Sequence, residues 1–177
     1  MGLRPTIDLF ASRLNYKLKP YIAYQPDPEA YAVNAFCVPW ENYVFYALSP
    51  FSIIQQVLQK VVAEKATGLL VVPHWPTQSL WPFLMNMLIN YPIILPRGKE
   101  TLYLPAQPQL VHALHNKLEL LLCHLSGNSS MTKEFRGKLL KSSKTRGERE
   151  PKSTIQHISS DGNATVVQEV SIPFQRL

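Results

Sequence analysis

Hydrophobic and polar residues follow their clearest pattern between residues 43 and 73. Residues 43–48 form a run of aromatic and β-branched side chains, which is typical of a strand buried on both faces. The apolar positions that follow keep helical spacing, with polar side chains opposite them; they are Ile53, Ile54, Val57, Leu58, Val61 and Val62. Residues 69–72 are again continuously apolar. The pattern predicts two buried strands joined by one amphipathic helix, and such strands pair in parallel through a right-handed crossover.

Shorter elements surround this unit. Ser52 is predicted to cap the helix, Gly68 to stop it, and Pro82 to break a later one. Strands are predicted at residues 6–11, 21–24, 92–95 and 101–104, and helical segments at residues 29–36, 77–88 and 110–125. The alternation of strands and helices predicts an α/β fold with a mainly parallel sheet.

The composition changes after Gly127, where residues 125–130 are a cluster of loop formers. Between Lys133 and Lys152 the chain carries eight basic and three acidic residues and few large apolar groups, so it cannot bury enough surface to offset its ordering entropy. We therefore expect an α/β domain at residues 5–127 and a basic, mostly disordered linker at residues 128–177. Within this linker we expect at most a short helix at residues 134–141. Residues 166–174 have a β-type pattern, but no segment nearby is expected to pair with them.

The formal net charge of +6 favours an anionic partner such as nucleic acid. Cys37 and Cys123 are the only cysteines, and without a secretory signal they are predicted to be free, buried thiols in a reducing compartment. No apolar run approaches the roughly 20 residues that cross a bilayer. We expect an intracellular protein, cytoplasmic or nuclear, with no membrane contact.

Distinctive residues follow three of the predicted strands. Ligands of open α/β sheets bind beyond the carboxyl ends of the strands, and residues 10–15, Ser49-Pro50-Phe51 and His74-Trp75-Pro76 occupy such ends. The alternative is that these are ordinary turns, in which proline, serine and asparagine are common.

A second candidate is a metal site at His112, His115, Cys123 and His124. If residues 110–125 form one helix, Cys123 lies about three turns beyond His112, which is poor geometry for a single ion. Asp8, Asp27 and Asp161 are the only aspartates, so a two-metal nuclease is also poorly supported. No metal is predicted.

A series of motifs in order, at residues 8–15, 26–28, 32–36, 49–51 and 71–78, resembles the polyprotein of DIRS-like retrotransposons. The similar segment of that polyprotein follows reverse transcriptase and ribonuclease H, and residues 157–163 resemble the linker that leads into its tyrosine recombinase. The resemblance covers residues 5–127. It implies that the other domains of the polyprotein, and DNA, are partners.

The resemblance further implies similarity to the phage-type DNA adenine methyltransferases, which have a Rossmann-like sheet. Their catalytic tetrapeptide, in which an acidic or amide side chain binds the adenine amino group and an aromatic ring stacks on the flipped base, falls on Leu48, Ser49, Pro50 and Phe51. Their cofactor, S-adenosylmethionine, would lie near Asp8, Phe10, Ala11 and Asn15. His74 and Trp75 would complete the rim.

The sequence departs from this pattern at the tetrapeptide. Leu48 cannot accept a hydrogen bond, Ser49 replaces a proline, and no glycine lies between Gly2 and Gly68 to let a cofactor approach the first strand. The hypothesis is a catalytically degenerate methyltransferase-like domain that binds nucleic acid. The alternatives are an active S-adenosylmethionine-dependent DNA adenine methyltransferase and an accessory segment of the adjacent reverse transcriptase and ribonuclease H.

Overall fold

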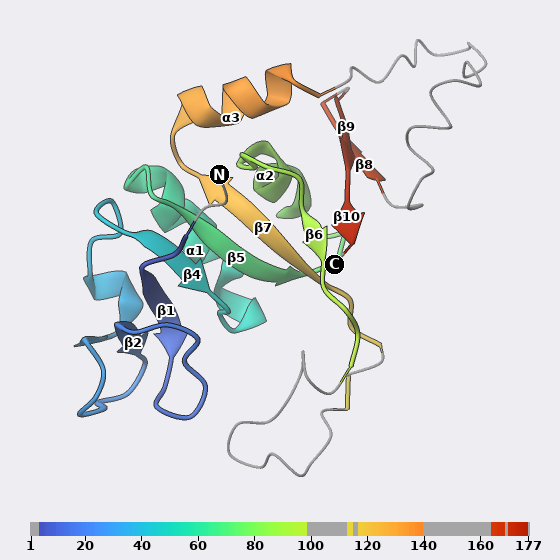
Figure 1. Ribbon diagram of the computed structural model, residues 1–177. Coiled ribbons are helices and arrows are strands. Elements are labelled where there is room, and N and C mark those ends of the chain that lie inside the picture. Colours follow the sequence, from blue (N-terminus) through green and yellow to red (C-terminus); the bar gives the residue numbers. More distant parts are fainter. Residues whose placement is uncertain (1–3, 99–112, 115–116, 140–163, 169, 177) are drawn as a thin grey trace, which may run out of the picture.

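The computed structural model describes residues 4–98, 113–114, 117–139, 164–168 and 170–176. Its centre is an eight-stranded sheet in the order β10-β6-β7-β5-β4-β1-β2-β3 (Figure 1). The strands are β1 (Ile7–Ala11), β2 (Tyr21–Ala23), β3 (Ala32–Val33), β4 (Val44–Ala47), β5 (Thr67–Pro73), β6 (Ile93–Ile94), β7 (Leu120–Ser126) and β10 (Gln175–Arg176). A separate antiparallel pair consists of β8 (Ala164–Val167) and β9 (Val170–Pro173).

Most neighbours in this sheet run parallel, and β7 is antiparallel to both β5 and β6. This confirms the predicted α/β class with a mainly parallel sheet. The helical elements are few: the 3-10 turns η1 (Ala35–Cys37) and η2 (Phe51–Ile53), and the helices α1 (Ile54–Ala63), α2 (Trp81–Asn86) and α3 (Ser129–Gly137). None of these described helices is long and apolar enough to cross a membrane.

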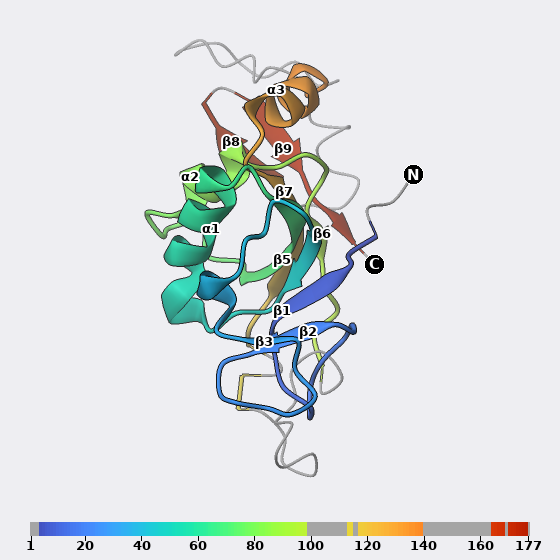
Figure 2. The ribbon, with the colours of Figure 1, turned by 90° about the vertical axis from the view of Figure 1, so that its left-hand side faces the viewer.

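The strand–helix–strand unit is confirmed as β4, α1 and β5. β4 and β5 pair in parallel with Ala47 opposite Leu70. The side chains of α1 that face the sheet are fully buried, and each contributes about 1.5–3 kcal/mol of hydrophobic stabilisation; they are Ile54, Val57, Leu58 and Val61. Among the described helices, α1 and α2 lie against the same face of the sheet (Figure 2).

The two predicted ends of this helix are wrong. Ser52 lies inside η2 and makes no capping bond, because the chain enters the helix through a 3-10 turn that begins at Phe51. The helix ends at Ala63, after which Lys65 adopts a positive φ of 50° and turns the chain toward β5. Gly68 lies within β5, where a Cβ atom would come within 2.4 Å of the Phe45 ring. Its role is close approach between two strands, not helix termination.

Three other helical predictions also need correction. Residues 120–125 of the predicted helix lie in strand β7; the continuous apolar run fits a strand buried between β5 and β6 as well as it fits a helix. The predicted helical turn at residues 29–36 is divided into β3 and the start of η1. Pro82 stands in the first turn of α2, where its missing N–H has no helical partner to lose, so it begins the helix and does not break it.

The end of the chain has partners that the sequence pattern did not reveal. β8 pairs with β9, and β10 adds to the main sheet beside β6. Phe174 is 4% exposed and belongs to the main hydrophobic core. The expectation that these residues have nothing to pair with is therefore wrong, and α3 starts at Ser129, earlier than predicted. The boundary after Gly127 stays a prediction; the predicted strand at residues 101–104 and most of the basic stretch lie outside the described residues.

Candidate binding site at the strand ends

The carboxyl ends of the central parallel strands lie level with one another. Asp8 of β1 is opposite Tyr46 of β4, and Tyr46 is opposite Leu69 of β5, so the three strands run side by side in the same direction. On the other side of β1, Ala11 is opposite Ala23 at the end of β2. The segments that follow β1, β2, β4 and β5 therefore emerge along a single edge of the sheet, which holds the three strand-end segments marked in the sequence together with the one after β2.

Phe51 and Trp75 meet at this edge. They come from the segments after β4 and β5, and their rings make an edge-to-face contact with centroids 5.5 Å apart and planes at 80°. Phe51 is partly buried against the core, whereas Trp75 remains 41% exposed. Aromatic pairs prefer this geometry, and the exposed indole leaves an apolar surface open to solvent beside a fixed phenyl ring.

Leu48 supplies no polar group to this edge. Its side chain packs against a small apolar cluster that contains Val71, Leu118 and Leu120. The next residues turn the chain into α1: the Pro50 carbonyl accepts a hydrogen bond from the Ile53 N–H at 3.1 Å. The position at which the resemblance places a hydrogen-bond acceptor is thus part of the hydrophobic packing.

Ser49 has a buried hydroxyl group that forms no hydrogen bond with the described residues. The residue is 3% exposed. A buried hydroxyl without a partner costs about 1–3 kcal/mol, and such groups in native proteins call for an explanation such as an unfilled binding position. Ser49 lies two residues before Phe51, so the unsatisfied hydroxyl and the aromatic pair belong to one edge of the sheet.

His74 is held by a carboxylate from the neighbouring chain segment, just before β7. Its Nδ1 lies 2.6 Å from Oε2 of Glu119, and Oε1 of Glu119 accepts a hydrogen bond of 2.9 Å from Arg97. The hydrogen bond to His74 is the main reason that the pKa of Glu119 lies below its ordinary value. His74 also packs against the rings of Trp81 and Phe174 at centroid distances of 5.4 and 5.3 Å.

Glu119 and Arg97 were missed at the sequence level. They lie 45 and 23 residues from His74 in the chain, and no motif connects them to it. Only the antiparallel pairing of β7 with β5 brings the residue before β7 to the residue after β5. The cluster fixes His74 as a positioned side chain beside Trp75.

Three of the four residues at which the resemblance places the cofactor are used by the fold itself. Asp8 is 2% exposed; burial raises its pKa, and its Oδ2 accepts the Lys17 N–H at 2.8 Å. Phe10 packs against the rings of Phe36 and Trp40, at 5.7 and 6.2 Å.

Asn15 closes the turn after β1. Its Oδ1 accepts hydrogen bonds from the backbone N–H of Ser12 at 2.7 Å and from the Ser12 hydroxyl at 2.9 Å. The side chain is therefore committed to holding the turn in shape.

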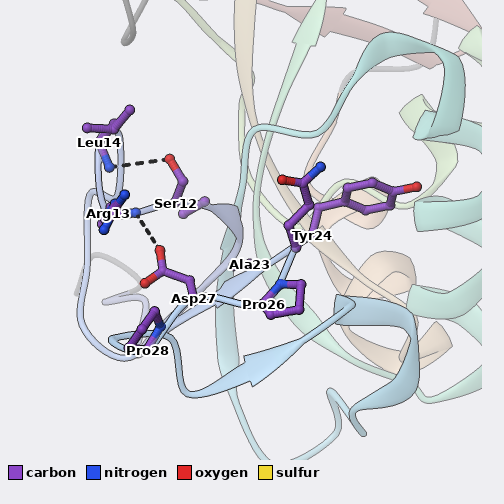
Figure 3. A pocket seen from close by; sticks show the side chains of 10 residues that line it. Ser12, Arg13, Leu14, Ala23, Tyr24, Pro26, Asp27 and Pro28 are labelled. Atoms are coloured by element: carbon purple, nitrogen blue, oxygen red, sulfur yellow. Dashed lines mark hydrogen bonds between the residues drawn. The ribbon is translucent and has the colours of Figure 1, made fainter.

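Ala11, the fourth of these residues, lines a cavity of about 360 Å³ between the ends of β1 and β2. Figure 3 shows Ser12, Arg13 and Leu14 on one side of it and Tyr24 on the other, with Pro26 and Asp27 between them. Of its lining, residues 11–14 belong to the strand-end segment 10–15, and residues 26–28 are one of the motifs that carry the resemblance. Tyr24 was missed, because a single tyrosine at the end of a short strand carries no binding signal.

Asp27 organises this cavity. Its Oδ2 accepts hydrogen bonds of 3.1 Å from the Arg13 N–H and from the Tyr21 hydroxyl, and its Oδ1 accepts one from the Glu29 N–H. The backbone bond from Glu29 is the largest cause of a pKa below the ordinary value of an aspartate. The bond to Arg13 joins the segments after β1 and β2, so the two walls of the cavity are held together.

The alternative metal site finds no support within the described residues, which contain no group of three potential ligands. Cys123 and His124 are consecutive residues of β7 and so point to opposite faces of the sheet. Burial raises the pKa of Cys123 to about 12 and lowers that of His124. His112 and His115 lie outside the described residues.

Comparison with protein-family models, with curated proteins and with solved structures finds no match for this chain.

Proposed function

We propose that this chain is a non-catalytic domain that binds single-stranded nucleic acid, with Phe51 and Trp75 as the residues on which a base stacks. The observation that carries the proposal is their edge-to-face contact at the carboxyl ends of β4 and β5, which leaves Trp75 exposed. Stacking on aromatic side chains is how proteins hold unpaired bases without reading their sequence.

The strand order supports this position for a ligand. β3, β2, β1, β4 and β5 lie side by side in the order of the doubly wound, Rossmann-type sheet, and the order reverses between β1 and β4. Ligands of such sheets bind in the crevice at that reversal, beyond the carboxyl ends of the strands. Ser49 and Phe51 follow β4 directly, and Trp75 follows the neighbouring strand.

The charge supports nucleic acid as the ligand. A net charge of +6 attracts a phosphate backbone through a long-range field that needs no specific contact. The resemblance to the DIRS-like polyprotein agrees with a DNA or RNA partner inside the cell. In this proposal the domain is a degenerate relative of the phage-type adenine methyltransferases that has kept a base-binding edge.

The proposal is non-catalytic because the residues present do not fit S-adenosylmethionine or its reaction. Asp8, Phe10 and Asn15 have side chains engaged in the fold, so only Ala11 remains to face a cofactor. Leu48 packs in an apolar cluster and cannot orient an adenine amino group. We therefore assign no chemical step to the site.

Fluorescence anisotropy with a labelled eight-nucleotide oligo(dT) tests the proposal. Phe51→Leu and Trp75→Leu each remove a ring but keep an apolar side chain, and each is expected to weaken binding by about 1–3 kcal/mol, the contribution of one base stack. Phe83→Leu is the matched control, because Phe83 is as exposed as Trp75, at 40%, but lies on α2. No binding by the wild type at low salt, or equal loss in all three variants, would show that this edge is not the binding surface.

An active methyltransferase is the second candidate, and the cavity beside Ala11 is the observation that favours it. Its volume of about 360 Å³ falls in the range of small-molecule sites. Titration calorimetry with S-adenosylmethionine separates the two functions: heat that fits a micromolar Kd would favour the enzyme, and no heat at millimolar ligand would exclude it.

A further inference from the structure

The cavity between the ends of β1 and β2 is lined by two exposed side chains, Tyr24 and Arg13. Tyr24 is 85% exposed, the largest exposed fraction among the large hydrophobic side chains that the structure describes. Arg13 donates its backbone N–H to Asp27, and its guanidinium forms no ion pair with a described carboxylate. A phenol ring and a guanidinium that line one cavity match the two parts of a nucleotide, the base and the phosphate.

We propose that this cavity is a second nucleotide subsite, in which Tyr24 stacks on a base and Arg13 binds the adjoining phosphate. The proposal rests on the proposed function, because the nucleic acid strand is the one held by Phe51 and Trp75. It adds a second anchor for the nucleic acid. The two anchors define the path of the nucleic acid over the protein, along the carboxyl ends of the β-strands from β5 to β2.

The sheet supplies the geometry for this path. β5, β4, β1 and β2 are consecutive neighbours, so their ends span three strand spacings of about 4.8 Å, roughly 14 Å in all. A stacked strand rises about 3.4 Å per nucleotide, so four steps cover this distance. An oligonucleotide of about five residues is therefore the shortest that reaches both anchors.

The carboxylate in the cavity is compatible with this ligand. Asp27 already accepts hydrogen bonds from Arg13, Glu29 and Tyr21, so much of its charge is met by donors within the fold. Figure 3 shows Asp27 between the two walls, with its dashed bond to the Arg13 backbone. A phosphate is expected on the solvent side of the Arg13 guanidinium, and the base against the exposed ring of Tyr24.

A length series on the full chain tests the subsite. The wild type is titrated with labelled oligo(dT) of three and eight nucleotides, beside Tyr24→Leu and Arg13→Gln. Tyr24→Leu is expected to weaken binding of the eight-mer about 5–150-fold, the effect of losing one base stack, and to leave the three-mer within twofold. Arg13→Gln is expected to lower the slope of log K against log salt by about 0.7 for the eight-mer, the share of one phosphate of a single strand.

Matched controls come from the opposite edge of the sheet. Tyr31 is 59% exposed and precedes β3, and Lys65 is exposed and precedes β5, so Tyr31→Leu removes the same phenol ring and Lys65→Gln the same positive charge at the amino ends of strands. Both are expected to bind the eight-mer within twofold of the wild type. Circular dichroism melts verify that every variant is folded.

The outcomes separate the two proposals. Wild-type affinity of Tyr24→Leu and Arg13→Gln for the eight-mer, combined with weakened binding by Phe51→Leu, would overturn the second subsite and leave the first. Equal weakening of both lengths by Tyr24→Leu would overturn the proposed span. If the wild type binds neither length at low salt, the proposed function fails and the subsite fails with it.

Discussion

The Nδ1 atom of His74 lies 2.6 Å from Oε2 of Glu119, and the backbone N–H of His74 donates to the Glu119 carbonyl at 2.9 Å. These two contacts extend the pairing of β5 and β7 by one residue beyond the strands. Both side chains are 18% exposed, so the pair is partly shielded from solvent. Arg97 donates to the second carboxylate oxygen, which holds Glu119 ionised.

Glu119→Gln is expected to lower the free energy of unfolding at neutral pH by about 1–3 kcal/mol, because charge-assisted bonds to His74 and Arg97 are lost. The folded-state pKa of Glu119 lies below its ordinary value of 4.5. Its stabilisation is therefore present above pH 4.5 and is lost as the pH falls through the folded-state pKa. Thermal melts of the wild type between pH 7 and pH 3 should fall more steeply below pH 4.5 than those of the variant.

Glu134→Gln is the control for this measurement. The pKa of Glu134 is also lowered, by its partner Lys138, but both side chains are at least 66% exposed. Exposed pairs of this kind add little stability. Two results together would contradict the role of Glu119. The stability of the wild type would fall more steeply with acid than that of Glu134→Gln, and it would fall no more steeply than that of Glu119→Gln.

Gly68→Ala is expected to destabilise the fold strongly. The new Cβ would lie 2.4 Å from both Cγ and the carbonyl oxygen of Phe45, and because one of these atoms is backbone, β4 and β5 would have to separate. Overpacking of a core typically costs 1–3 kcal/mol, and backbone displacement places this substitution at or above the upper end of that range. The midpoint of urea unfolding measures the change.

Gly137→Ala provides the comparison, since nothing lies within 4 Å of the Cβ that it would add at the end of α3. It is expected to be neutral or to stabilise the protein by up to about 1 kcal/mol, through higher helix propensity. Equal effects of the two substitutions would show that Gly68 is not required for the approach of the strands.

The parts of the fold that were predictable depend on local pattern. Residues 43–73 could be assigned because apolar spacing changes from a strand run to helical spacing and back within one short segment, and each change is visible without knowing its neighbours. Gly68 shows the limit of such reasoning. A glycine after a helix is usually a helix terminator, and only the position of Phe45 in the adjacent strand shows that it serves strand packing.

The parts that were not predictable depend on residues far apart in the chain. The leucines at residues 120–122 have an apolar pattern that fits a helix or a buried strand, and the pairing of β7 with both β5 and β6 decides for the strand. The same holds for the candidate site. Phe51 and Trp75 were predictable because they follow predicted strands, whereas the contact of Glu119 with His74 and the cavity lined by Tyr24 depend on how the strands pair in the sheet.

The two cysteines are expected to differ sharply in reactivity. Cys37 is exposed, contrary to the prediction that both thiols are buried, whereas Cys123 is fully buried in β7 and burial raises its pKa to about 12. Because the thiolate is the reactive form, Cys123 is inert in the folded protein. Titration with a thiol-reactive disulfide should release one equivalent rapidly from the native protein and a second only in denaturant. Cys37→Ser should abolish the rapid phase, and a rapid phase that persists would contradict the burial of Cys123.

Ser49→Ala is expected to stabilise the protein while weakening its binding. The substitution removes a buried hydroxyl with no described partner, so the free energy of unfolding should rise by about 1–3 kcal/mol in urea unfolding. If that hydroxyl is kept for a bound base beside Phe51, the variant should also bind the eight-nucleotide oligo(dT) more weakly, because functional sites commonly retain groups that cost stability. Ser52→Ala is the control. Ser52 is exposed and is the second residue of η2, the turn that follows Ser49, so its substitution should change stability by less than about 0.5 kcal/mol. Destabilisation by Ser49→Ala would show instead that the hydroxyl has a partner in the folded protein, and that the fold and not a ligand accounts for it.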